Sequence, residues 1–90
     1  MAIFYDNLRA EDVDTLNRLT NLLHDLRDSR TALLARHGAG DEDALLAKIR
    51  AGEAGEHPAY EDYLGARTIA TLRESIRADL KDYMLNIRLP

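Results

Sequence analysis

The sequence predicts an all-α protein, in which two long antiparallel helices form a hairpin and a short helix lies between them. Apolar residues recur at steps of three and four along most of the chain, which places them on one side of an α-helix. Apart from Gly65, the glycines and prolines stand between these periodic stretches or at the end of the chain, where helices are punctuated. We expect helices at about 9–37, about 41–51 and about 58–87, within a single domain of residues 1–90.

The first long helix is predicted to start near a capping side chain, either Asn7 or Asp12. Its apolar positions alternate in steps of three and four from Leu16 onward, as in a coiled-coil seam. Leu22 and Leu34 widen this stripe, so we expect the helix to contact more than one neighbour. The apolar set is Val13, Leu16, Leu19, Leu23, Leu26 and Leu33.

The short helix is predicted between Asp41, a good N-terminal cap, and Gly52, which ends it. A helix of this length is marginal by itself in water. We therefore expect its apolar side to dock against the long helices. That side is formed by Leu45, Leu46 and Ile49.

The last helix begins at Pro58, because proline is well suited to the first helical turn. Its apolar side contains Gly65, Ile69, Leu72, Ile76, Leu80, Tyr83 and Ile87. With short connections, the two long helices are antiparallel neighbours. If Ile69 faces Leu26, the expected pairs are Leu72–Leu23, Ile76–Leu19, Leu80–Leu16, Tyr83–Val13 and Gly65–Arg30, in a register that could slip by one turn.

Two long helices packed side by side leave much of their apolar surface uncovered. The expected remedy is a second copy of the chain, giving a two-fold homodimer with a four-helix core. A different protein, or the short helix folded across the groove, are the alternatives. Residues 1–7 form an N-terminal arm with the apolar run Ile3-Phe4-Tyr5. We expect Phe4 to pack on the helices or on a second subunit.

Composition excludes several classes of protein. The chain has 90 residues, no cysteine and a formal net charge of −4. The absence of cysteine excludes disulfides and thiolate metal sites and fits a reducing compartment, so we expect a cytoplasmic protein. The acidic balance argues against nucleic-acid binding, which normally uses a basic face. No apolar run is long enough for a membrane span, so no membrane partner is expected.

No catalytic, metal or cofactor site can be assembled from the sequence. His24 and Asp28 lie four positions apart on the first helix, but this pair supplies two ligands where zinc needs three or four. Ser29 and Ser75 have no histidine at a neighbouring helical position, so neither is an activated nucleophile. No glycine-rich phosphate loop follows a strand. We expect a non-enzymatic protein without a cofactor.

Five residues are candidates for binding a partner. Tyr60, Tyr63 and Arg67 are spaced three and four apart and can share one side of a helix, and such side chains often anchor protein contacts. The alternative is that both tyrosines close the end of the core. Arg30 occupies a seam position between leucines, either to bind an anion or partner or to lie over Gly65 and pair with Glu61 or Asp62. His57 precedes Pro58 as a loop or cap residue. The five candidates are Tyr60, Tyr63, Arg67, Arg30 and His57.

The leading functional hypothesis is a protein-interaction module: an adaptor, regulator or accessory subunit acting as a helical homodimer. An alternative is an acidic inhibitor that masks a basic partner. The residues Glu56-His57-Pro58 and Asp62-Tyr63 resemble a segment of the colicin-immunity proteins, over a handful of residues and without the tyrosine-rich turn of that family. The third hypothesis, a chorismate-mutase-like helical enzyme, fits the order of long, short and long helices. Such a site needs several inward basic residues and a late Gln, and this chain has no Gln.

Overall fold

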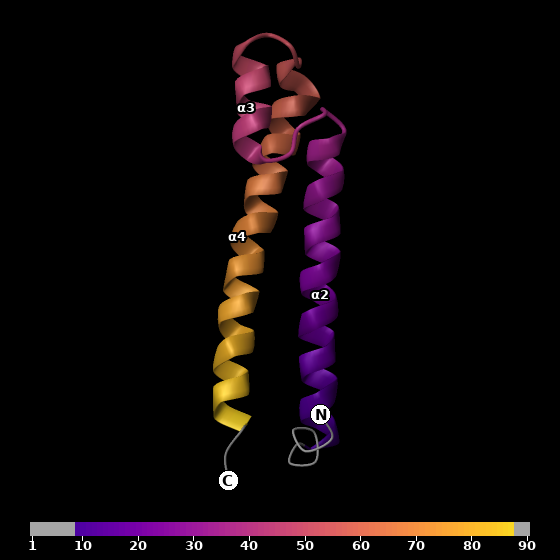
Figure 1. Cartoon of the computed structure of the whole chain (residues 1–90), viewed down its shortest axis with the longest axis vertical. Helices are drawn as coiled ribbons and strands as arrows, with labels where there is room; N and C mark the ends of the chain where they lie inside the picture. The colour runs from indigo at the N-terminus through magenta and orange to yellow at the C-terminus, as the bar shows by residue number, and fades with distance from the viewer. Residues whose placement is uncertain (1–8, 88–90) are drawn as a thin grey trace.

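The computed structural model describes residues 9–87, and its helices follow one another as α2 (Ala10–Ala35), α3 (Glu42–Arg50) and α4 (Glu56–Ile87). Figure 1 shows α2 and α4 side by side along the rod, with α3 against α4 at one end. The rod measures 57 × 17 × 17 Å. The all-helical prediction is confirmed, and the helices begin and end within two residues of the expected positions. The predicted arm, residues 1–7, lies outside the described residues.

The helix ends follow local chemistry, with one exception. The carboxylate of Asp41 caps α3 by accepting a hydrogen bond from the Ala44 N–H at 2.8 Å, as predicted. The N-terminus of α2 differs: its capping position is Arg9, which makes no side-chain cap. Asn7 lies outside the described residues. The prediction that Asp12 caps α2 is wrong, because Asp12 lies inside the helix and faces α4.

Steric preferences of the backbone explain where α2 ends and where the regular part of α4 begins. Gly38 has a φ of +67°, and the Ala39 N–H donates to the Leu34 carbonyl at 3.1 Å, which together end α2 in a Schellman motif. His57 is extended, with φ −116° and ψ 118°, because the ring of the following proline disfavours the helical conformation. The regular part of α4 therefore starts at Pro58, as the sequence predicts.

The core lies at the end of the rod where the three helices meet. Leu34 from α2 and Leu45 from α3 are its largest fully buried side chains, at 1% and 0% exposure. Small residues surround them and let the helices approach closely. The buried cluster consists of Leu34, Ala39, Leu45, Ala59 and Ala66, with Ile49, Ala54 and Tyr63 packed against it.

The rest of the hairpin is far less covered. Among the described residues, Leu23 and Ile76 are the buried hydrophobic side chains outside the core cluster. The other seam positions are only half-buried, and they include Leu16, Leu19, Leu26, Ile69, Leu80 and Tyr83. The long helices thus contact each other along a narrow line, and their flanks stay open to solvent.

Two polar contacts fix how α2 and α4 are aligned. The Tyr83 hydroxyl donates to the Asp12 carboxylate at 2.5 Å, which lowers the pKa of Asp12 and raises the pKa of Tyr83. The Arg73 guanidinium donates to the Leu23 carbonyl at 3.1 Å. The expected register is therefore right to within a residue over this part of the hairpin.

The register prediction is wrong at two positions. A Cβ added to Gly65 would lie 3.2 Å from Cδ1 of Leu33, so Leu33 occupies the place expected for Arg30, about one turn away. Leu72 was expected to face Leu23, but its side chain is 46% exposed. Arg73 reaches the Leu23 backbone instead, and Leu72 lines a shallow pocket together with Thr68 of the same helix.

Candidate protein-interaction site

Helix periodicity places six apolar side chains along the same flank of the hairpin, and we call this set the hairpin face. Leu33 lies beside Gly65, so the side of α2 that carries Leu33 adjoins the side of α4 that carries Gly65. Residues seven or eleven positions apart share a side of a helix, as do residues four apart. The hairpin face is therefore formed by Leu19, Leu22, Leu26 and Leu33 of α2 and by Ile69 and Leu72 of α4.

The hairpin face is only partly covered by the rest of the described chain. Leu22 and Leu72 are 41% and 46% exposed, and the other four side chains are half-buried. Isolated exposed leucines are ordinary on protein surfaces, but contiguous apolar patches mark contact sites. Here the patch follows both long helices, on the part of the rod that lacks a core of its own.

Arg30 does not form the ion pair that the sequence predicted for it. Its guanidinium forms a two-pronged ion pair with the Glu42 carboxylate at the start of α3, with the Nε–Oε2 distance at 2.6 Å. The expected pairing with Glu61 or Asp62 is wrong. Arg30 instead ties α2 to α3, and the hydrogen bonds from Arg30 lower the pKa of Glu42, against a smaller opposing effect of burial.

This ion pair makes the stability of the fold sensitive to acid. Because its pKa is lowered from 4.5, Glu42 stabilises the folded state above about pH 4.5, and this contribution is lost as the pH falls through the lowered pKa. We expect Glu42→Gln to cost about 1 kcal/mol at pH 7, after allowance for solvent screening. The variant should also lose less stability than the wild type between about pH 5 and pH 3.

Urea unfolding followed by circular dichroism at several pH values measures both effects. Glu61→Gln is the matched control, because the partner of Glu61 among residues 9–87 is the exposed His57, at 3.1 Å. Exposed pairs of this kind contribute little to stability. Parallel stability–pH curves for the wild type and Glu42→Gln would contradict the assigned role of Glu42.

Asp62 is buried beneath the end of α2 and is fully paired. Its carboxylate lies 2.8 Å from His37 Nε2 and 3.4 Å from Arg36 Nη1. These contacts join the last turn of α2 to the first turns of α4. Asp62 therefore serves the packing of this end of the rod and is not available to a ligand.

Tyr60, Tyr63 and Arg67 are brought together on one side of α4, as their spacing predicts. The two tyrosine rings are stacked with centroids 5.8 Å apart, and the Arg67 guanidinium lies 5.8 Å from the Tyr63 centroid. Tyr63 packs against the core while Tyr60 is exposed. We call this group the tyrosine ladder. His57 is exposed beside it in sequence and pairs with Glu61.

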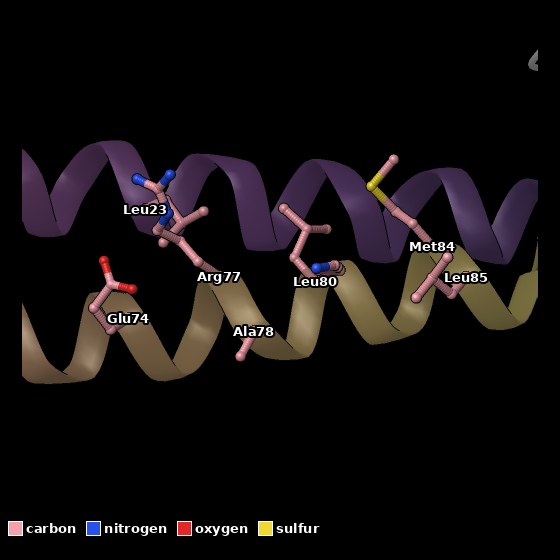
Figure 2. A pocket seen from close by; sticks show the side chains of 8 residues that line it. Leu23, Glu74, Arg77, Ala78, Leu80, Met84 and Leu85 are labelled. Atoms are coloured by element: carbon pink, nitrogen blue, oxygen red, sulfur yellow. The ribbon is translucent and has the colours of Figure 1, made fainter.

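The structure also has a groove along α4, away from the hairpin face, which the sequence pattern did not predict. It has a volume of about 760 Å³ and lies between the last turns of α4 and Leu23 of α2. Figure 2 shows Arg77, Leu80 and Met84 extending from α4 toward α2. Leu80 was assigned to the seam, whereas Ala78, Met84 and Leu85 were assigned no role. The seven-residue spacing of Ala78 and Leu85 was the available signal.

The described residues offer no metal centre. No group of three or more His, Asp or Glu side chains between positions 9 and 87 is placed to hold an ion. His24, one half of the pair considered above, is exposed on α2. Of the helices in this part of the chain, none combines the length and the apolar character that crossing a bilayer requires.

Comparison with known proteins places the chain in a family. No curated protein and no solved structure matches it significantly. A family model does match, and it spans residues 8–87, which includes all three described helices. The chain therefore belongs to the Uncharacterized protein MJ0235 family.

Proposed function

We propose that this chain is a non-enzymatic protein-interaction module that works as a two-fold homodimer. The hairpin face of one subunit packs against the same face of the other, which produces a four-helix core. The observation that carries this proposal is the exposure of Leu22 and Leu72 on the flank of the hairpin where apolar side chains recur along both long helices.

The energetics allow a second copy to occupy this face. Each of the six side chains gains on the order of 1 kcal/mol when its remaining apolar surface is buried. Twelve such side chains across a two-fold interface therefore provide on the order of 10 kcal/mol, which is comparable with the cost of association. A self-complementary apolar surface needs no charge matching, so two copies of an acidic chain can share it.

A second protein would bind elsewhere on the dimer, and the tyrosine ladder is the surface we assign to it. The tyrosine end of the ladder lies on a different side of α4 from Leu72, because nine positions separate Tyr63 from Leu72, whereas Arg67 and Leu72 line one shallow pocket. It stays accessible when the hairpin face is covered. Such an arrangement fits an adaptor, a regulator or a small accessory subunit.

The chorismate-mutase-like alternative is less well supported. That kind of site needs several basic side chains directed into one cavity. Arg30 was the inward basic residue in the sequence, and its guanidinium is bound by Glu42. No comparable observation supports the acidic inhibitor over the interaction module.

Analytical ultracentrifugation tests the proposed dimer. We expect a particle of twice the chain mass of 10.1 kDa, which dissociates on dilution. A particle of single-chain mass at every concentration up to the millimolar range would contradict the proposal.

A further inference from the structure

The groove lined by Leu23, Leu80, Met84 and Leu85 is separate from the hairpin face. Leu85 follows Leu72 by thirteen positions, which places it on nearly the opposite side of α4. A dimer built through the hairpin face therefore leaves this groove open. Its floor is apolar, and the rim carries Glu74, Arg77 and Lys81.

We propose that the groove binds the N-terminal arm of the same chain, with Phe4 as the inserted side chain and Ile3 and Tyr5 beside it. The arm lies outside the described residues. The end of the rod at which the described chain begins and the chemistry of the groove support this assignment. The proposal goes beyond the function proposed above and holds for a monomer or a dimer.

The described chain begins at the end of the rod where one end of the groove lies. Arg9 is extended, with φ −76° and ψ 157°, and its guanidinium lies 3.6 Å from the Asp12 carboxylate. Asp12 in turn accepts the hydrogen bond from Tyr83, one residue before Met84. Arg9 is therefore at the same end of the rod as Met84 and Leu85, which line the groove.

The length of the arm matches the groove. Phe4 precedes Arg9 by five residues, and an extended chain of that length reaches about 17 Å. The helical rise from Tyr83 back to Arg77 is about 9 Å. Phe4 can therefore reach any side chain that lines this part of the groove.

The arm and the groove are also chemically complementary. Phe4 is the only phenylalanine of the chain, and it lies within the apolar run Ile3-Phe4-Tyr5. Leu80 and Met84 offer apolar contacts, and a thioether packs well against an aromatic ring. Asp6 follows the run and carries a charge opposite to those of Arg77 and Lys81 at the rim.

The covalent tether favours the chain's own arm over other occupants. A short link gives the arm an effective concentration near the groove on the order of millimolar. An arm of a second copy would have to reach the groove from the far side of the hairpin face. We therefore assign the groove to the arm of its own subunit.

Disulfide trapping tests this assignment, because the chain has no cysteine and every disulfide must join introduced residues. The test variant carries Phe4→Cys and Met84→Cys. The control carries Phe4→Cys and Asp82→Cys, since Asp82 is at nearly the same height but on another side of α4. We expect mild oxidation to close an intramolecular disulfide at least tenfold faster in the test variant.

Non-reducing electrophoresis and mass spectrometry separate the outcomes. Equal rates in the two variants, or a failure to react, would overturn the proposal. A test variant that forms mainly disulfide-linked dimers would overturn it too, in favour of an exchanged arm. Circular dichroism confirms that both variants are folded. Adding Leu72→Glu to both variants should leave the rates unchanged, which separates this proposal from the dimer.

Nuclear magnetic resonance tests the docking of the arm independently, without introduced cysteines. In nuclear magnetic resonance spectra we expect nuclear Overhauser contacts between the Phe4 ring and the methyl groups of Leu80 and Met84. Phe4→Ala should shift the resonances of these methyl groups and leave that of Leu72 in place. Unchanged methyl resonances in Phe4→Ala would contradict docking of the arm.

Discussion

Leu72→Glu is expected to dissociate the proposed homodimer and to raise its dissociation constant by at least a hundredfold. A two-fold interface contains both copies of Leu72, so the substitution removes two apolar contacts and introduces two carboxylates. Loss of about 1 kcal/mol per leucine, together with a cost of at least about 1 kcal/mol for desolvating each carboxylate, corresponds to a change in affinity of several hundredfold. Sedimentation equilibrium of the wild type and the variant measures this change directly.

Leu85→Glu provides the matched control for this experiment. Leu85 belongs to the same helix and is 48% exposed, against 46% for Leu72, but it lies outside the hairpin face. The same chemical change should therefore leave the dissociation constant within about threefold of the wild type. Equal weakening by both substitutions would show that general charge, and not the hairpin face, controls association.

Leu45→Ala is expected to lower the free energy of unfolding by about 2–5 kcal/mol, the usual cost of truncating a buried leucine. Leu45 is completely buried and is the main apolar contact of α3 with the other helices. The cavity would remain because the surrounding alanines are too small to fill it. For a domain of this size, such a loss is a large part of the total stability.

Denaturant unfolding at a fixed protein concentration measures this effect, since a dimer would make the midpoint depend on concentration. Leu64→Ala is the control, because Leu64 is exposed on α4 and its truncation should change stability by about 0.5 kcal/mol or less. A similar loss in both variants would mean that the core cluster does not dominate the stability of the chain.

Periodicity predicted the helices well, because the spacing of apolar residues within a helix indicates which side of that helix is buried. The start of α3 was equally predictable, since an aspartate cap acts within a few residues of itself. The position of the core was not predictable in this way. The leucine pattern favours the seam of the long hairpin, whereas the closest packing depends on Ala39, Ala59 and Ala66. Small residues carry little hydropathy signal, although they decide how closely helices approach.

The candidate site shows the same division between local and distant information. The tyrosine ladder follows from spacings of three and four within one helix. The partner of Arg30 could not be found by such reasoning, because Glu42 belongs to another helix whose position depends on the tertiary fold. The exposure of Leu72 was missed for a related reason: which residue of α4 meets Leu23 depends on how the two helices pack, and Arg73 makes that contact through its side chain.

The buried core lies at one end of the rod. Amide protons at the two ends should therefore exchange with solvent through different opening reactions. Amide protons near Leu34 and Leu45 are protected by the buried cluster, so their exchange with solvent requires global unfolding. Amide protons around Leu19, which belongs to the hairpin face, are protected only by half-buried side chains, and dissociation of the proposed dimer would suffice to release them. Exchange rates at that end would then report on subunit association, while those at the α3 end report on the folding of one chain.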